Sequence, residues 1–338
     1  MSASEGTPQN LRIHLRGSHT TLGVEVPRRM PHILTTGQET PINDKKSGRL
    51  KLAEWLTQPN HPLTARVLVN RVWQAHFGDG LVRSPDNFGS LGEKPSHPEL
   101  LDWLATEFVR NGWSIKSLHR LILNSAVWQQ TTDFNDAADT IDPENRLLSR
   151  MNRRRLEAEA IRDSLLAIGG DLDTAMGGTL LPTENRKYVT STANINIDVY
   201  EAPRRTIYLP VVRSALNDYL TAFDFGDPSA MSGQRERTTV APQSLFLMNS
   251  KLVAAQSKNL ATSLLASSAD DPGRVAKAFE RFYSRPAAEA EIKSSLAFIA
   301  SYEDSLRSRD TAAELLRPMA WQAFCRALMA TNEFLYVN

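Results

Sequence analysis

Apolar residues three and four positions apart recur through residues 49–131, and this periodicity constrains the fold more than any other feature of the chain. Residues that end helices divide this region into segments. Pro59 follows the first periodic segment, Gly78 follows the second, and Gly112 follows the third. Periodic apolar segments between such signals are typical of amphipathic helices that share a core. We therefore predict a mainly α fold, a multi-helix, bundle-like body with one or two small β-hairpins.

Length and charge narrow the class of protein. A chain of 338 residues suits one large domain or two smaller ones, and it should bury roughly 75% of its unfolded surface without a metal or a disulfide. Lys and Arg total 39 against 38 Asp and Glu, so the net charge of +1 gives no general attraction to nucleic acid or anionic lipid. The single cysteine, Cys325, excludes CxxC and CxxCH motifs, and we expect it in the core. We predict no cofactor and no metal in this chain.

Residues 11–26 show the two-residue alternation of a β-hairpin. Apolar and polar side chains alternate on both sides of a turn signal at Gly17. A lone hairpin is marginal in water, so another module should cover its apolar face. The prolines between residues 27 and 46 indicate a connector. We predict an N-terminal β-hairpin and connector over residues 1–46 and a helical domain over residues 47–338.

The N-terminal residues and the hydropathy of the chain bear on targeting. The segment MSASEGTPQN has no basic region followed by an apolar one, so we expect no signal peptide in this chain. No apolar run approaches the ~18 residues that span a bilayer, so we also expect no transmembrane segment.

A glycine-rich loop over residues 78–94 follows the second predicted helix. That helix carries Asn70 and Arg71 beside Trp73, and a buried amide or guanidinium group fixes whatever it bonds, so these side chains are expected to organise the loop. The loop itself contains Asp86. Its polar groups form either a functional site or a structural brace, and we favour the brace.

Ser96 followed by Glu99 predicts a capping box that starts a helix through Pro98, which explains His97 without catalysis. Because His61, His76 and His97 all lie near predicted helix ends, a catalytic or metal-binding cluster is the alternative. The polar residues that we take as candidate catalytic groups are Asn70, Arg71, His76, Asp86, Asn87, His97 and Glu99.

A basic patch at Arg150 and residues 153–155 is the feature most suggestive of nucleic-acid binding. Acidic residues follow at once, and on a helix beginning near Asn152 they would pair with these arginines at four-residue spacing. No aromatic side chain is interleaved to stack on bases. We therefore predict a solvated, charge-paired helix and no nucleic-acid binding.

Residues 169–214 change character, with glycines followed by two segments of alternating apolar residues around Ile197 and Ile207. These predict a second β-hairpin, an insertion near residues 187–213. The flanking arginines form either an anion clamp for a carboxylate or acidic sugar, or ion pairs with Asp224 and Asp227, and we favour the ion pairs. The clamp residues are Arg204, Arg205 and Arg213.

Common catalytic motifs are missing from the sequence. Asp224, Phe225 and Gly226 imitate the magnesium-binding triplet of protein kinases, but the glycine-rich and catalytic loops of a kinase do not accompany them. The sequence also contains no GxGxxG, Walker, HExxH or GxSxG pattern. The usual nucleotide-binding, zinc-protease and serine-hydrolase routes therefore have no support.

Four segments carry a resemblance to a known family: NRVWQAHFGDGLVRSPDNFG at 70–89, PSHPELLDWLATEF at 95–108, LEAEAIRDSLL at 156–166 and TNEFLYV at 331–337. The sequences of these segments resemble the planctomycete-type domain of unknown function 1553, a family that has no assigned chemistry. The resemblance covers nearly the whole chain. It implies the C-terminal part of a longer exported protein, behind domain of unknown function 1549 and often a cytochrome c module.

Two functions are compatible with the residues and the resemblance. The first is an auxiliary or docking module of a larger exported, redox-linked protein, bound to an upstream domain or a cytochrome-bearing partner. The alternative is a hydrolase or lyase that acts on a polyanionic polysaccharide with some of the candidate polar residues. We favour the docking module, because each candidate acid or base has a structural explanation and no motif fixes a catalytic pair.

Overall fold

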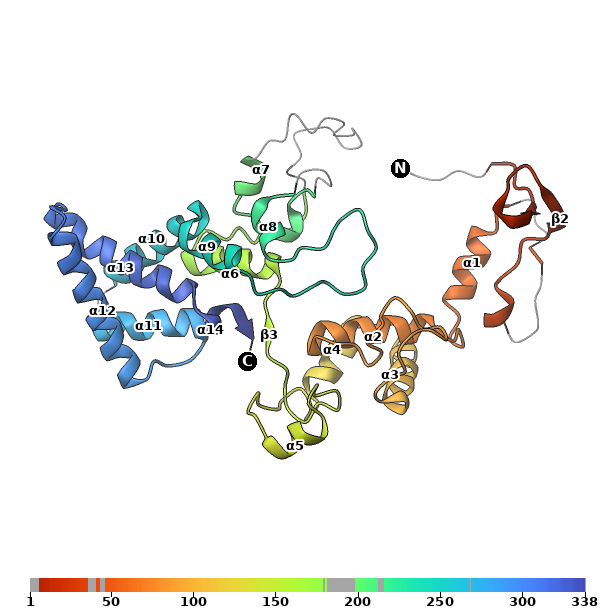
Figure 1. Ribbon diagram of the computed structural model, residues 1–338, viewed down its shortest axis with the longest axis horizontal. Coiled ribbons are helices and arrows are strands. Elements are labelled where there is room, and N and C mark those ends of the chain that lie inside the picture. The colour runs from red at the N-terminus through yellow and green to blue at the C-terminus, as the bar shows by residue number, and fades with distance from the viewer. Residues whose placement is uncertain are drawn as a thin grey trace. The chain divides into compact units, whose positions relative to one another are not determined.

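The computed structural model describes residues 6–35, 41–42, 46–178, 180, 198–211, 216–267 and 269–337. The chain divides into two compact units, an N-terminal unit of residues 1–151 and a C-terminal unit of residues 152–338 (Figure 1). Among the described residues helices dominate both units, and each unit contains one two-stranded antiparallel sheet, so the predicted mainly α fold is confirmed. The predicted boundary at residue 46 stays a prediction.

The N-terminal unit begins with the predicted hairpin. Strands β1 (Leu11–His14) and β2 (Leu22–Val26) pair antiparallel, with Arg12 opposite Glu25 and an irregular register before His14. A 3-10 turn at Leu15–Gly17 joins them, and it places Arg16 and Gly17 at positive φ. Every residue of β1 is exposed to solvent, so the described part of the chain leaves both faces of this strand uncovered.

The helices of the N-terminal unit follow the predicted stop signals. They are α1 (Arg49–Leu56), α2 (Thr64–Phe77), α3 (Pro98–Arg110), α4 (Ile115–Leu123) and α5 (Asp136–Ile141). Gly78 ends α2 with φ +93°, and the Ser114 hydroxyl accepts the Ser117 amide to start α4. Local signals thus set these boundaries.

The start of α3 differs from the prediction in its capping. Helix α3 does begin at Pro98, but its N-cap residue is His97, and no side chain caps it. The Ser96 hydroxyl instead donates to the carbonyl oxygen of Leu81 at 3.4 Å. The predicted capping box between Ser96 and Glu99 is therefore wrong, because Ser96 bonds the preceding loop rather than the helix.

One hydrophobic core joins α2, α3 and α4. Its largest members include Phe77, Phe108 and Ile122, each at most 2% exposed, and the rings of Trp73 and Phe77 stack with centroids 4.2 Å apart. Burying a side chain of this size contributes about 1.5–3 kcal/mol. This core holds the groove and the loop described below.

The C-terminal unit is a helical bundle closed by a short sheet. Its elements are β3 (Arg154–Arg155), α6 (Ala158–Gly169), α7 (Asp198–Glu201), a 3-10 turn (Thr206–Tyr208), α8 (Asp218–Ala222), α9 (Ala241–Asn249), α10 (Lys251–Ala266), α11 (Asp271–Tyr283), α12 (Glu289–Arg307), α13 (Ala313–Met329), α14 (Asn332–Leu335) and β4 (Tyr336–Val337). Helix α13 packs against α10 and α12, as Figure 1 shows. Strand β3 pairs with β4 and so ties the start of the unit to its end.

Small residues allow close packing in this bundle. Ala278 and Ala320 are fully buried beside Trp321, and Cys325 is also fully buried, as predicted. Gly169 ends α6 where the side chain of Gln256 crosses it, and a methyl group there would meet the Gln256 Oε1 atom at 1.9 Å. Glycine is thus the residue that permits α6 and α10 to approach at this point.

Two predictions for the C-terminal unit are wrong in the described residues. The charge-paired helix expected from Asn152 does not form, because Arg154–Arg155 lie in β3 and α6 starts at Ala158. Around Ile207 the chain makes a 3-10 turn rather than a strand, and the segment before it forms α7. The rest of the predicted hairpin insertion lies outside the described residues.

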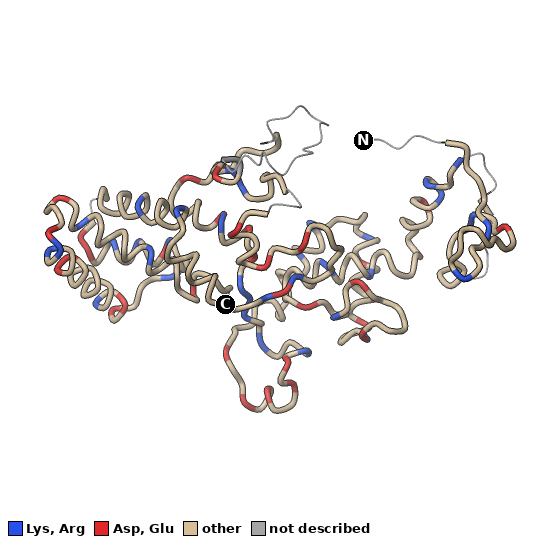
Figure 2. The backbone as a smooth tube through the Cα atoms, turned by 45° about the horizontal axis from the view of Figure 1, so that its top comes forward, with Lys and Arg blue, Asp and Glu red and all other residues tan. Residues whose placement is uncertain are grey.

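No helix in the part of the chain that the structure describes has both the length and the apolar character to span a membrane. Acidic and basic residues are interspersed along the helices of the C-terminal unit (Figure 2). The two signs of charge also pair at close range there, for example Arg235 with Glu159 at 2.8 Å.

Candidate functional site

Asn70, on α2, is fully buried and holds the loop that follows this helix. Its amide nitrogen donates to the Val82 carbonyl at 2.9 Å, and its amide oxygen accepts the Val82 N–H at 2.8 Å. Gly80 passes so close that a methyl group there would lie 2.6 Å from the Asn70 amide nitrogen. Asn70 therefore braces the loop, which is one of the two roles expected from its position.

The polar side chains of the 78–94 loop are engaged in local contacts. Arg71 pairs with Asp86 at 3.3 Å, and both side chains are more than half exposed. The Asn87 side chain accepts the Gly89 N–H at 3.0 Å, which shapes the turn itself. Arg83 lies 2.7 Å from Glu144, outside the loop. These contacts give Arg71, Asp86 and Asn87, three of the candidate polar residues, a structural role in holding the loop.

The three histidines expected near helix ends do not form one cluster. His61 caps α2, since its Nδ1 atom accepts the Thr64 N–H at 3.1 Å. His97 lies beside its neighbour Ser96, with its Nδ1 atom 3.0 Å from the hydroxyl, while Glu99 is an exposed residue in the first turn of α3. In the described residues no three His, Cys, Asp or Glu side chains are arranged to hold a metal ion.

His76 has a partner that the sequence reasoning missed. Its Nε2 atom lies 2.7 Å from the Nδ1 atom of His119 on α4, and the Trp128 ring packs edge-on against His76. In such a contact one ring nitrogen donates and the other accepts, so the two rings fix each other's tautomer. His119 directly follows the buried Leu118 on α4, but no pattern of nearby residues reveals a contact with His76, 43 residues away.

The arginines of the predicted anion clamp are held within the C-terminal unit. Arg204 lies 3.4 Å from Asp173 and donates to the Ala175 carbonyl at 2.8 Å. Arg205 donates to the Thr174 carbonyl at 3.2 Å, and both guanidinium groups face the Tyr208 ring. Arg213 lies outside the described residues. The ion-pair interpretation fits Arg204, although its partner is Asp173 rather than the Asp224 or Asp227 that we expected.

Arg162 is a second residue that the sequence reasoning missed. Its side chain is only 3% exposed, and it donates to the carbonyls of Tyr200, Ala202 and Arg204. The neighbouring Asp163 accepts from the Thr206 hydroxyl at 2.6 Å. Helix α6 thereby fixes the path of residues 200–206. The guanidinium serves as an anchor for the backbone, and burial lowers the pKa of Arg162.

Cys325 carries no nucleophilic role in this setting. Burial raises the pKa of its thiol to about 12, so the reactive thiolate is scarcely populated at neutral pH. This agrees with the core position expected from the sequence.

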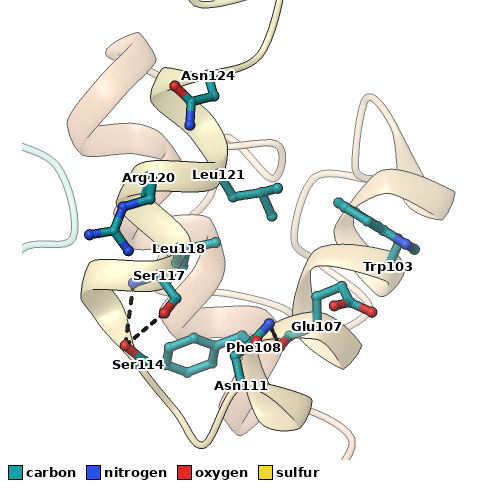
Figure 3. Close-up of a pocket in the computed structure, with 10 residues that line it drawn as sticks. All are labelled: Trp103, Glu107, Phe108, Asn111, Ser114, Ser117, Leu118, Arg120, Leu121 and Asn124. Atoms are coloured by element: carbon teal, nitrogen blue, oxygen red, sulfur yellow. Dashed lines mark hydrogen bonds between the residues drawn. The ribbon is translucent and has the colours of Figure 1, made fainter.

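A groove that is open to solvent lies between α3 and α4 in the N-terminal unit. It has a volume of about 350 Å³. Trp103 on α3 and Leu121 on α4 form its opposite walls, and Phe108 and Leu118 form its floor (Figure 3). The polar side chains that complete the lining are Glu107, Asn111, Ser114, Ser117, Arg120 and Asn124. None of the predicted candidate residues lines this groove.

In a comparison with protein families, the family described as PSD1, protein of unknown function (DUF1553), matches residues 48–299. The matched residues include the loop braced by Asn70, the groove between α3 and α4, and most of the C-terminal bundle. No curated protein and no solved structure matches the chain.

Proposed function

Since the chain belongs to the PSD1 (DUF1553) family of proteins of unknown function, we propose its role from the surfaces that the fold leaves open: it is an auxiliary docking module, and the β1–β2 hairpin is its docking surface. The observation that carries this proposal is the exposure of the hairpin's apolar residues. Leu11 is 74% exposed and Val24 is 68% exposed. Exposed apolar side chains that gather on one short element often mark a site of interaction with another protein.

The backbone of the hairpin adds to this surface. A two-stranded sheet is marginal by itself, and here both strands have an outer edge in the described part of the chain. An incoming strand can therefore form main-chain hydrogen bonds at either edge while its side chains cover the apolar residues. A partner of this kind removes both the exposed apolar area and the unpaired edge.

The charge of the hairpin together with the segment that follows it indicates the chemistry of the partner. Residues 6–35, which include both, contain four Arg and one Glu, a net charge of +3, whereas the whole chain carries only +1. Arg12, Arg16, Arg28 and Arg29 supply the positive charge. The partner that we propose is a protein domain with an apolar strand and acidic side chains around it. A neighbouring module of an exported, redox-linked protein is the form of partner that the family resemblance implies.

A site-specific cross-linking experiment identifies the partner. A photoactivatable phenylalanine is placed at Val24 or, as a control, at Ile141, which is 81% exposed on α5. Both proteins are expressed in the source organism and illuminated. We expect one protein to cross-link from position 24 and not from position 141. Cross-links that are equal at the two positions, or none at position 24, contradict a docking role for the hairpin.

A reconstitution with the purified partner then measures the interaction. Leu11→Asp together with Val24→Asp should abolish binding and leave the melting temperature of the chain within about 2 °C, because both side chains are exposed. Ile141→Asp is the matched control. Binding should also weaken as salt rises, since the basic segment of residues 6–35 would face acidic groups of the partner. Unchanged binding by the double variant, or loss of its folded state, would refute the proposal.

A further inference from the structure

The groove between α3 and α4 combines an apolar interior with a polar rim. Phe108 and Leu118 at its floor are no more than 3% exposed, whereas Trp103 is 50% exposed and Leu121 is 39% exposed on the two walls. Figure 3 shows the Trp103 ring and the Leu121 side chain facing each other across the opening. At about 350 Å³ the groove lies within the size range of small-molecule sites.

Trp103 lies outside the buried core of the N-terminal unit, and half of its surface is exposed. The core of α3 is built from Leu101, Leu104, Ala105 and Phe108, and Trp103 stands outside that face. Its indole presents a broad exposed surface to the groove. An exposed aromatic ring beside a cavity is a stacking platform for a flat apolar ligand face.

The rim limits the charge of a ligand. Glu107 is the acidic residue of the lining, and Arg110 already pairs with it at 2.5 Å. A polyanion would meet the Glu107 carboxylate, and a cation would compete with Arg110 for it. The guanidinium of Arg120 points away from Leu121 and Trp103 in Figure 3, so it does not offer positive charge to the interior. An uncharged ligand fits this arrangement best.

The rim also requires a ligand that forms hydrogen bonds. The Asn124 side chain lies at the mouth of the groove and makes no hydrogen bond within the described part of the chain. The Ser117 hydroxyl donates to Ser114 at 3.1 Å, which leaves its lone pairs as acceptors. A purely apolar ligand would remove water from these groups without replacing its hydrogen bonds, which is costly.

We propose that the α3–α4 groove binds an uncharged sugar ring, with Trp103 as the stacking platform. A sugar ring has a face of C–H groups that packs on an indole and an edge of hydroxyl groups. Those hydroxyls donate to the Glu107 carboxylate and accept from the Asn124 amide. The same geometry disfavours anionic polysaccharides. The proposal concerns a different surface from the hairpin, so either can fail without the other.

Titration calorimetry with a panel of oligosaccharides tests the proposal on the full chain. The uncharged probes are the hexaoses of cellulose, chitin, xylan, mannan, laminarin and starch, and a heparin hexasaccharide is the anionic control. We expect at least one uncharged probe to bind with a Kd below about 5 mM and heparin not to compete for it. Failure of every uncharged probe at that concentration overturns the proposal.

Variants of the groove locate the binding. Trp103→Ala should weaken the binding of the positive probe by roughly tenfold or more, whereas Trp103→Phe should retain most of it. Asn124→Ala should weaken it by about threefold to tenfold. Ile115→Ala is the control, since Ile115 is 47% exposed on α4 and does not line the groove. Circular dichroism verifies that each variant folds.

Two results would overturn the assignment even if a sugar binds. Binding that survives Trp103→Ala unchanged places the sugar elsewhere on the chain. Loss of the hairpin's protein partner on Trp103→Ala, with no effect on sugar binding, makes the groove a protein contact instead.

Discussion

Arg155 and Asp224 form a buried ion pair across 69 residues of sequence, with the guanidinium Nη2 atom 2.6 Å from the carboxylate. Their side chains are 6% and 14% exposed. The same carboxylate accepts the N–H and the hydroxyl of Thr238, both at 2.8 Å. The pair thus joins strand β3, the turn after α8 and the segment before α9. Asp224 adopts φ +59°, so these contacts hold it in the left-handed region.

The first prediction is that Asp224→Asn strongly destabilises the C-terminal unit. Burial alone would raise the pKa of Asp224, but hydrogen bonds from Arg155 and Thr238 outweigh it and hold the pKa below its usual value. The asparagine keeps the shape and leaves the Arg155 charge buried without its counter-ion. We expect a loss of about 3 kcal/mol in the free energy of unfolding, measured in urea.

The control for this pair is Asp227→Asn. Asp227 is exposed, and among the described residues its carboxylate accepts only a local N–H from Ser229. We expect a change below about 1 kcal/mol. Equal effects of the two substitutions would show that the Arg155 contact contributes little.

The second prediction concerns the Asn70 brace. Asn70→Ala leaves both the N–H and the carbonyl of Val82 without their partner in a buried site, so the N-terminal unit should lose about 2–4 kcal/mol. Gly80→Ala should also destabilise this unit, because the added methyl would lie 2.6 Å from both the Asn70 amide nitrogen and the Val82 carbonyl oxygen. Chemical denaturation of the chain measures both effects.

A double variant tests whether the two residues act on one structure. Removing the Asn70 amide relieves part of the clash at position 80, so the combined loss should be smaller than the sum of the single losses. Gly89→Ala is the control in the same loop, since its methyl would meet only the Asn87 side-chain oxygen at 3.2 Å. Additive losses would mean that Asn70 and Gly80 stabilise different parts of the loop.

The sequence predicted best those elements that local chemistry determines. Gly78 ends α2 and Pro98 begins α3 where the pattern indicated, and the N-terminal hairpin forms where apolar and polar residues alternate. The helix predicted from Asn152 failed for the opposite reason. Arg155 found its partner in Asp224, and no pattern of nearby residues reveals a contact at that separation.

The candidate site shows the same division. Asn70 was identified as a candidate because a buried amide on an apolar helix requires a hydrogen-bond partner. In the structure that partner is the backbone of Val82. His119 and Trp103 were missed, although each stands next to a core residue, Leu118 and Leu104 respectively. Their importance comes from what lies across the helix pair, His76 for one and Leu121 for the other. Helical periodicity predicts on which side of a helix a residue lies, but it does not predict which residue of another helix it contacts.

The third prediction is that Arg285→Lys weakens the closure of the C-terminal bundle. Arg285 binds Glu291 on α12 and Glu333 on α14 with paired hydrogen bonds, an arrangement that one ammonium group cannot reproduce. The side chains are about one-third exposed, so we expect a loss of about 1 kcal/mol at neutral pH. Arg307→Lys, at a more exposed pair, should have a smaller effect.

Acid should remove the difference between Arg285 and lysine. Hydrogen bonds from Arg285 and from the Ala288 N–H lower the pKa of Glu291 to about 2. A carboxylate with a lowered pKa stabilises the fold above its unfolded pKa, and this contribution is lost as the pH falls toward the folded value. The two proteins should therefore converge in stability between about pH 4.5 and pH 2. A constant difference across that window would exclude a carboxylate origin.

The fourth prediction is that His61 makes the N-terminal unit sensitive to mild acid. Its Nδ1 atom accepts the N–H groups of Leu63 and Thr64, so the ring proton must lie on Nε2, which is buried without a hydrogen-bond partner in the described residues. Burial lowers the pKa of His61. Protonation would place a hydrogen on Nδ1 and break the cap of α2.

The direction of the effect follows from the protons bound in each state. The unfolded chain binds a proton on His61 at a higher pH than the folded chain does, so stability is complete above about pH 6.5 and falls as the pH drops below it. His61→Asn keeps an acceptor at the cap but does not titrate. The melting temperature of the natural protein should therefore decrease more between about pH 8 and pH 5 than that of the variant. His19→Asn, in the exposed hairpin turn, serves as the control and should follow the natural protein. If His61→Asn also follows it, the cap does not depend on the protonation of His61.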